Sequence, residues 1–450
     1  MPANRRGFPA LRARLRVTAL LLSAVLAIGI AVAPAVTKAD GPQPFSDHIT
    51  GDWGGLRTQL LNDGVDVDFN YTSESATNVQ GGATKLVRYT DQLTFGTTLD
   101  LQKLVGVNNA TIQFTITDRN GKNLSADAGL DSLQQVQEVY GRGQTWRLTQ
   151  LWYDQNYFND ALDLKIGRLT EGEDFAAFSC EFMNLTFCGA PPGNLVGDYW
   201  FNWPVSQWAA RVKTNIAGFG YAQIGVYQVN PSYLNADGEI NFGSPSGTTG
   251  ALIPVEVGWM PTFGKQQLQG SYKFGGWYNT SRTADPVENT DGGFLSVGGG
   301  TPLQHNGAWG AYINFQQQLT KPSSVDPNQG LSAFLNFTYA DPQTSTLDGQ
   351  LAMGLFYTGP FDSRPMDQVG IAIGGTHVNS RVADSEEAQN AAGLGPVDVQ
   401  HTEYAAELYY NARLYNGVYL QPDFQYVHEP GGVSANTDDV ILGLKVHLDF

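Results

Sequence analysis

The feature that most constrains this chain is the alternation of apolar and polar side chains over residues 440–450. Apolar residues hold every second position, Lys445 and Asp449 fall on the opposite face, and only Ile441 breaks the pattern. Successive side chains of a strand point to opposite faces, so one face suits lipid and the other suits water. Taken alone, the segment fits either the last strand of a transmembrane β-barrel or an edge strand of a soluble sandwich.

Residues 1–39 have the pattern of a secretory signal peptide, with a basic start, an apolar run from Val17 to Val36 and small residues before Asp40. An uncleaved membrane anchor is the alternative, because the run approaches the length that spans a bilayer. Removing this segment would leave 20 of the 26 basic residues and all 43 acidic ones, changing the formal charge from −17 to −23. Such a charge argues against nucleic-acid binding, which needs a basic surface.

Alternation continues upstream and predicts sixteen antiparallel strands, with fourteen or eighteen as alternatives. The links between them are alternately short and long, as in outer-membrane barrels with short periplasmic turns and long outer loops. We therefore predict an all-β, transmembrane, up-and-down barrel over residues 65–450, wide enough for an aqueous channel. The expected strands lie near 65–74, 87–101, 108–118, 145–154, 162–168, 208–216, 219–229, 253–260, 266–280, 307–319, 331–340, 350–358, 367–378, 402–414, 418–428 and 440–450.

A periplasmic segment, residues 40–64, is expected to precede the barrel. Residues 51–64 predict a short helix with leucines on one side, ended by Gly64. We expect this helix to pack near the barrel mouth.

Two outer links are long enough to fold inward, from Arg119 to about Gln144 and from Leu169 to about Gln207. The second of these is too rich in aromatic residues for a disordered external loop, so we expect it to pack against the inner barrel wall. An external lid or a subunit contact is the alternative. Cys180 and Cys188 in this link predict a disulfide in an oxidising compartment, and metal binding is the lesser interpretation because no histidine lies near them.

Charged and aromatic residues around these links suit a constriction for neutral polyols. Arginine offers a planar fork of donors that matches a pair of vicinal hydroxyl groups. Carboxylates accept hydrogen bonds from other hydroxyls, and aromatic faces stack on the apolar side of a sugar ring. The alternative is that these charges pair with one another and only pin the loop. The candidate constriction residues are Arg119, Arg147, Arg168, Glu171, Glu173, Asp174, Trp200, Arg211 and Lys213.

The sequence does not favour catalysis. It has no Gly-x-Ser-x-Gly nucleophile motif, and its six histidines lack metal-ligand spacing. Glu171 and Glu173 resemble a glycosidase pair only in being two nearby acids. We therefore expect no enzyme activity, no cofactor and no metal site.

Several motifs make the chain resemble the carbohydrate-selective outer-membrane porins, the glucose-inducible porins of Gram-negative bacteria. They are G-D-W-G-G-L-R (51–57), T-D-R-N-G (117–121), Y-G-R-G-Q-T-W-R (140–147), G-R-L-T-x-G-E-D-F (167–175), C-E-F-M-N-L-T-F-C-G (180–189), G-D-Y-W-F-N-W-P-V-S-Q-W (197–208) and Q-P-D-F-Q-Y (421–426).

The resemblance implies a sixteen-stranded outer-membrane barrel that admits glucose and related small sugars. It also implies contact with outer-membrane lipid and lipopolysaccharide, and a role for Phe450 as the aromatic read by the barrel-assembly machinery. Two other hypotheses remain at this point. One is a general or cation-preferring porin, suggested by the charge of −23, and the other is a structural barrel with a closed lumen.

Overall fold

A computed structural model describes residues 45–235, 240–322 and 328–450. The predicted signal segment, its cleavage site and the first residues of the periplasmic segment lie outside the described residues. Within the described residues, no helix is long and apolar enough to cross a membrane.

The described residues form one antiparallel sheet in which sixteen strands close on themselves. Each strand pairs with its neighbour in sequence, and β17 pairs back to β1 from Asn70↔Asp449 to Gln80↔Val440. The strands are β1 (Val65–Gln80), β2 (Val87–Asp100), β3 (Ala110–Gly121), β4 (Trp146–Tyr157), β5 (Leu162–Leu169), β6 (Gln207–Ile216), β7 (Gly220–Val229), β8 (Gly250–Trp259), β10 (Leu268–Asn289), β11 (Pro302–Gln318), β12 (Gly330–Ala340), β13 (Leu347–Thr358), β14 (Gln368–Val378), β15 (Thr402–Tyr415), β16 (Val418–His428) and β17 (Asp439–Asp449), with the two-residue β9 (Thr262–Phe263) paired only to β10. The predicted barrel with sixteen strands is confirmed.

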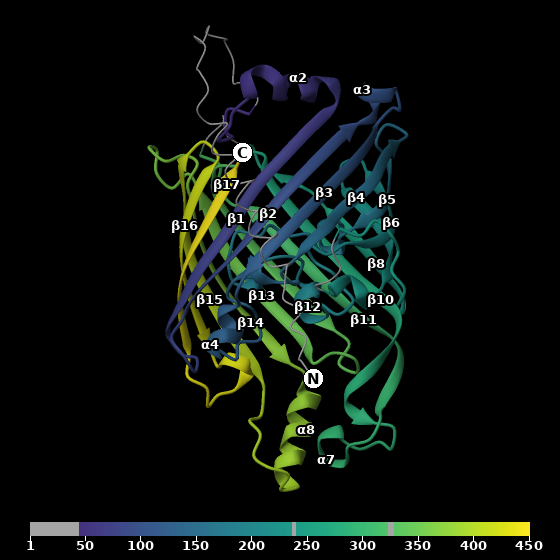
Figure 1. Cartoon of the computed structure of the whole chain (residues 1–450), viewed down its shortest axis with the longest axis vertical. Helices are drawn as coiled ribbons and strands as arrows, with labels where there is room; N and C mark the ends of the chain where they lie inside the picture. The colour runs from purple at the N-terminus through teal and green to yellow at the C-terminus, as the bar shows by residue number, and fades with distance from the viewer. Residues whose placement is uncertain (1–44, 236–239, 323–327) are drawn as a thin grey trace, which may run out of the picture. The chain divides into compact units, whose positions relative to one another are not determined.

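Short and long links separate to opposite ends of the barrel, as the sequence predicted. Helices α2 (Leu56–Asp63) and α3 (Leu101–Val105) lie at the end that holds Phe450, and α4 (Leu124–Ala128), α7 (Leu295–Gly298) and α8 (Ser380–Ala391) lie toward the other end (Figure 1). We call these the short-link end and the long-link end. Strands β10 and β11 extend well beyond their predicted limits at the long-link end.

The one residue that broke the alternation, Ile441, is explained by the structure. Its side chain points inward and is fully buried against Leu124, Leu130 and Val136 of the link between β3 and β4. The inner face is thus apolar at the height where a loop covers it. Outward-facing neighbours such as Leu442 remain exposed to the membrane side.

The predicted helix before the barrel is also confirmed. Helix α2 ends at Gly64, which adopts φ 98° and returns its N–H to the last turn. The buried Arg57 of this helix donates hydrogen bonds to the backbone oxygens of Val67 in β1 (2.9 Å) and Phe450 (2.8 Å). The helix is therefore attached to the seam where the first and last strands meet.

Candidate functional site

The lumen is narrowed by two long links that fold inward from the long-link end. The second loop, residues 122–145, joins β3 to β4 and contains α4 and the 3-10 turn η2 (Glu138–Tyr140). The third loop, residues 170–206, joins β5 to β6 and contains α5 (Glu171–Asp174), η3 (Leu185–Phe187) and α6 (Pro192–Leu195). Segments η3 and α6 contact β12, β13 and β14, so the third loop crosses the lumen to distant strands.

Aromatic side chains of the third loop pack on the inner wall, as predicted from the composition of this loop. Trp200 lies edge-on to Trp277 of β10 and Tyr312 of β11, with ring centroids 5.4 and 6.1 Å apart. Phe182 packs in the same way on Phe334 of β12 and Tyr409 of β15. These rings exclude water between loop and wall, which favours the folded-in position of the loop.

Carboxylates of the wall hold the backbone of both loops. Glu403 of β15 accepts hydrogen bonds from the N–H groups of Leu133 (2.6 Å) and Gln134 (3.3 Å) in the second loop. Glu407, further along the same strand, accepts from Met183 (2.6 Å) and Asn184 (2.9 Å) in the third loop. Loop N–H groups that would be buried without a partner are thereby satisfied.

The same arrangement recurs at two other positions on the wall. Glu256 of β8 accepts from the N–H of Ala176 (2.8 Å), and Glu74 of β1 accepts from the N–H of Val139 (3.2 Å). Glu403 and Glu407 alternate with outward-facing residues along β15, but the sequence pattern did not identify this role. The available signal was an acidic residue on the inner face of β15 with no lysine or arginine on the neighbouring β14 and β16.

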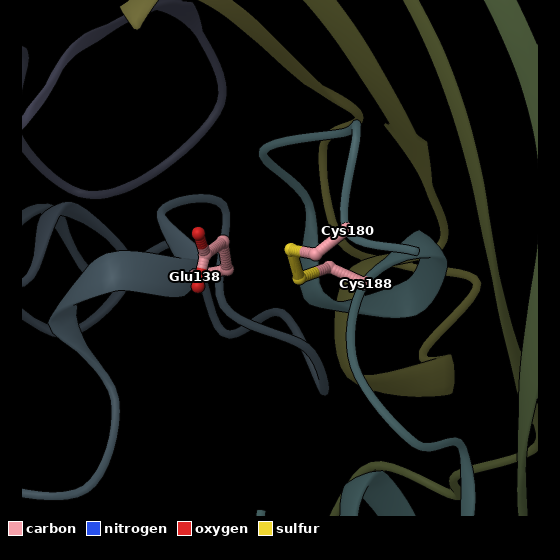
Figure 2. Close-up of side chains that lie close together, drawn as sticks. All are labelled: Glu138, Cys180 and Cys188. Carbon is pink, nitrogen blue, oxygen red and sulfur yellow. A yellow bond between two sulfur atoms is a disulfide. The ribbon is translucent and has the colours of Figure 1, made fainter. Parts of the chain in front are cut away.

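The two loops also bind each other close to the disulfide. The N–H of Glu138 donates to the backbone oxygen of Met183 (2.9 Å), and the N–H of Leu185 donates to that of Gln135 (2.9 Å). Cys180 and Cys188 form the predicted disulfide, which faces Glu138 across the gap between the loops (Figure 2). Both sulfurs are used in the disulfide, so this group offers no thiolate to a metal ion.

A cavity of about 940 Å³ remains between the two loops and the inner wall, where residues of β1 to β3 and of β15 to β17 line it. Its volume is within the range of small-molecule sites. The charged and polar residues that line it include Arg119, Glu138, Arg142, Glu173, Glu181, Trp203, Lys445, His447 and Asp449. Two of the predicted constriction residues, Arg119 and Glu173, are therefore at this cavity.

Charges of opposite sign alternate along the cavity wall. Arg119 of β3 lies 3.6 Å from Glu138, which lies 3.2 Å from Lys445 of β17. Gln92 of β2 accepts hydrogen bonds from Arg119 (2.8 Å) and from the indole N–H of Trp203 (3.0 Å). Fixed donors, acceptors and an aromatic face thus border one space, which is the set of groups that a neutral polyol requires.

The acid of α5 that lines the cavity is held in place from two sides. Glu173 accepts hydrogen bonds from Thr170 (2.5 Å) and Gln150 (2.6 Å). Burial raises the pKa of Glu173 above its ordinary value. It is positioned to accept or, when protonated, to donate a hydrogen bond toward the cavity.

Arg147 and Arg168 lie away from this cavity. They line a second, smaller cavity of about 210 Å³ with residues of the link between β7 and β8, including Tyr233 and Asn241. Arg168 of β5 donates to the backbone oxygens of Ser206 and Asn241, each at 2.8 Å. The structure therefore divides the predicted arginines between two places.

Arg211 and Asp174 belong to a network of charges at the base of the third loop. Arg211 of β6 lies 2.7 Å from Asp163 and 3.1 Å from Asp154, and its Nε is 3.7 Å from Asp174. Lys165 pairs with Asp174 at 3.1 Å. This network fits the alternative that these charges pair with one another and hold the loop in place, because opposite charges compensate one another within it.

Of the remaining candidates, two are fully buried and Lys213 is half-buried. Trp200 is 0% exposed within the aromatic cluster, and Glu171 is 0% exposed with its Oε2 accepting from the N–H of Phe201 (3.1 Å). Lys213 lies over the ring of Tyr221 at 4.6 Å. None of these three lines the larger cavity, whereas Glu138, Arg142, Trp203 and Lys445 line it without having been selected from the sequence. Their positions depend on how the loops fold, and alternation within the strands does not predict loop folding.

Comparisons with known proteins agree with this architecture. The family model for carbohydrate-selective porins of the OprB family matches residues 84–450. Porin B of Pseudomonas aeruginosa is 42% identical over the full length of both chains. The putative porin QuiX of Acinetobacter baylyi is 35% identical, covering 89% of this chain and 93% of QuiX. The high-pH structure of Pseudomonas putida OprB is 42% identical, with a TM-score of 0.87 over 92% of this chain and 100% of that one.

Proposed function

Since this chain belongs to the carbohydrate-selective porin family, OprB, we propose that it mediates passive diffusion selective for glucose and related small sugars. As a porin of this family it is a channel rather than an enzyme, and it crosses the outer membrane of a Gram-negative bacterium with its barrel strands. Selectivity would arise in the larger cavity, at a constriction lined by arginine, acidic and aromatic side chains.

The observation that carries this proposal is the loop-lined cavity with its fixed polar groups. Arg119 presents a guanidinium that Gln92 and Glu138 hold in one orientation. Glu173 supplies an acceptor, and Trp203 supplies an aromatic face beside them. A sugar that loses water on entering would find replacement hydrogen bonds here, whereas an apolar solute of similar size would leave these groups unpaired.

A general or cation-preferring porin is the second candidate, favoured by the charge of −23 expected for residues 40–450. The charges at the cavity itself are closer to balance. The cationic residues there are Arg119, Arg142 and Lys445, and the acidic ones are Glu138, Glu173, Glu181 and Asp449. Because short-range charges dominate selectivity at physiological salt, we favour the sugar-selective function.

Liposome swelling with the full chain tests this function. We expect glucose to enter about tenfold faster than a neutral amino acid of similar size, because the sugar alone matches the donors and acceptors of the cavity. Arg119→Gln should lower the glucose rate more than the amino-acid rate. The matched control is Arg381→Gln on α8, which should change neither rate.

Rates that depend on size alone, in the wild-type chain and in Arg119→Gln, would exclude sugar selectivity and favour a general porin. A strong preference for potassium over chloride at low salt, together with size-only rates for neutral solutes, would favour the cation-preferring alternative.

A further inference from the structure

One side-chain oxygen on the barrel wall accepts hydrogen bonds from two groups that line the larger cavity. The Oε1 of Gln92 in β2 accepts from the Nε of Arg119 (2.8 Å) and from the indole N–H of Trp203 (3.0 Å). All three residues line the cavity. Because a carbonyl oxygen has two lone pairs, these two donors use its full accepting capacity.

Gln92 and Arg119 belong to the barrel wall, whereas Trp203 belongs to the third loop. Gln92 lies directly opposite Arg119 in the ladder between β2 and β3, so both side chains point to the same face of the sheet. Trp203 lies near the end of the third loop, and among the described residues its N–H donates to the Gln92 oxygen alone. Gln92 therefore attaches an aromatic side chain of the loop to an arginine of the wall.

The orientation of the Gln92 amide is determined by its neighbours. The guanidinium and the indole can only donate, so the amide oxygen, and not the amide nitrogen, must face them. The Nε2 group of Gln92 donates to the hydroxyl of Thr94 on the same strand (3.3 Å). Leucine at this position would have a similar size but would supply no acceptor to either donor.

Arg119 keeps other acceptors when the Gln92 oxygen is removed. Its Nη1 donates to the backbone oxygens of Glu138 (3.1 Å) and Gly141 (2.9 Å), and its Nη2 lies 3.6 Å from the carboxylate of Glu138. The indole N–H of Trp203 has no second acceptor among the described residues. Loss of the Gln92 oxygen should therefore release the indole while the arginine stays attached to the loop backbone.

An arginine and an indole fixed side by side suit a ring-shaped solute. A pyranose has hydroxyl groups at its edge, which can accept from guanidinium N–H groups, and an apolar face of C–H groups, which can pack on an aromatic ring. An open-chain polyol has the hydroxyl groups but no rigid face, and it loses more conformational freedom when it binds. The pair therefore favours cyclic sugars over open-chain polyols of equal size.

On the premise of the sugar-porin function proposed above, we infer that Gln92 is a positioning residue that makes the channel prefer cyclic sugars. It acts through Trp203, whose indole it holds beside Arg119 at the larger cavity. Without this hydrogen bond the indole would take several orientations, and only the hydroxyl contacts that all polyols share would remain. A ring already held in its binding orientation favours the matching solute, because little ordering is required on binding.

Liposome swelling with glucose and sorbitol tests this role, since the two solutes have equal numbers of carbon and oxygen atoms. We expect the wild type to admit glucose about fivefold faster than sorbitol, and Gln92→Leu to admit glucose as slowly as sorbitol, because one net hydrogen bond is lost. Gln92→Glu keeps an acceptor and should retain most of the preference. Gln304→Leu at an exposed position of β11 is the matched control and should behave like the wild type. An unchanged preference in Gln92→Leu would overturn the inference.

Trp203→Phe tests the same contact from the loop side, so it decides the question even if Gln92→Leu fails to fold. It keeps an aromatic ring, removes the N–H donor and should lower the glucose preference as Gln92→Leu does. The double variant Gln92→Leu/Trp203→Phe should admit glucose as fast as either single variant, because both substitutions remove the same hydrogen bond. Additive losses of the glucose rate would show that Gln92 acts independently of Trp203 and would overturn the inference.

Comparison with a neutral amino acid of similar size separates this inference from the proposed function. If glucose and sorbitol enter the wild type equally fast and both outpace the amino acid, the sugar-porin function stands and the role of Gln92 is refuted. A fall of both polyol rates by one factor in Gln92→Leu, without rescue by Gln92→Glu, would assign Gln92 to loop folding alone and refute its role in selectivity. Rates set by size for all three solutes would contradict the proposed function and remove the premise of the inference.

Discussion

At the scale of single residues, the partner of a charge decides its role in this lumen. Arg211 lies among three aspartates and is compensated within the protein. Arg119 shares a cavity with its partner Glu138, and Arg168 has only carbonyl acceptors among the described residues. Three arginines that look equivalent in the sequence therefore have three different environments, set by the loops that cover them.

Glu403 tests the role of wall carboxylates in holding the loops. Its carboxylate accepts from three N–H groups, those of Leu133, Gln134 and Gly431. In Glu403→Ala these buried donors lose their acceptor, and we expect the free energy of unfolding to fall by about 3 kcal/mol. Chemical denaturation in detergent would measure the change.

Glu387→Ala on the exposed face of α8 is the matched control and should be neutral. Equal stability of Glu403→Ala and Glu387→Ala would contradict the anchoring role. We also expect Glu403→Ala to raise single-channel conductance, since the second loop would be less firmly attached to the wall.

The buried Glu171 makes the free energy of unfolding depend on pH. Burial raises the pKa of Glu171 well above 4.5, so the folded protein keeps a proton that the unfolded chain releases. The free energy of unfolding therefore falls as pH rises above 4.5, by up to about 1.4 kcal/mol per pH unit, until the folded-state pKa is passed. Thermal unfolding between about pH 5 and 9 would follow this loss.

Glu171→Gln imitates the protonated carboxyl and should flatten that part of the profile. The comparison of the two proteins isolates Glu171 from other titrating groups. Parallel profiles for the wild type and Glu171→Gln would show that this carboxyl does not contribute.

At the scale of elements, the last residue of the chain contacts both the first strand and helix α2. Phe450 donates its N–H to the backbone oxygen of Phe69 in β1 (3.0 Å), and the two rings lie 4.9 Å apart. Arg57 of α2 holds the backbone oxygen of Phe450. The last residue thus connects the first strand, the last strand and helix α2.

Phe450 is also proposed as the assembly signal, and two variants separate this role from sealing the barrel. Deleting Phe450 should lower the amount of protein inserted into the outer membrane several-fold. Arg57→Gln keeps the terminal aromatic and should insert normally, with a free energy of unfolding lower by about 2 kcal/mol. Heat-modifiable migration of membrane fractions would measure insertion, and chemical denaturation would measure stability. Normal insertion of the deletion variant would refute the signal role.

Pro422 affects the pairing of β16 with its two neighbouring strands. Proline cannot donate a ladder hydrogen bond, so its position within the alternating segment 418–428 predicts disrupted pairing there. The ladder to β15 skips the pairs opposite Gln421 and Pro422, whereas the ladder to β17 is continuous through Pro422↔Leu444. The strand accommodates the proline by losing pairs on one side only.

At the scale of the whole molecule, the barrel was predictable because every strand has one face toward lipid and the other toward water. Lipid outside and water inside impose a period of two, and the links at the two ends differ in length. The limits of β10 and β11 were underestimated because residues 281–289 and 302–306 lack alternating apolar and polar side chains. Helix α8, capped by Asn379, was missed because strand alternation does not detect a helix.

The site was less predictable because it depends on contacts between loops distant in sequence. Aromatic content indicated that the third loop packs on the wall, and two of the predicted constriction residues, Arg119 and Glu173, line the larger cavity. The positions of Glu138 and Lys445 follow from hydrogen bonds between the second and third loops, which no local pattern encodes. The same is true of the separate cavity at Arg168.

The most direct test of sugar recognition in the larger cavity is the single-channel conductance of the full chain as glucose is added. We predict a saturable decrease, because glucose occupies a site lined by Arg119, Glu173 and Trp203, and a weaker decrease in Arg119→Gln. A decrease that is linear in concentration, identical for any solute of equal viscosity and unchanged in Arg119→Gln would contradict recognition in this cavity.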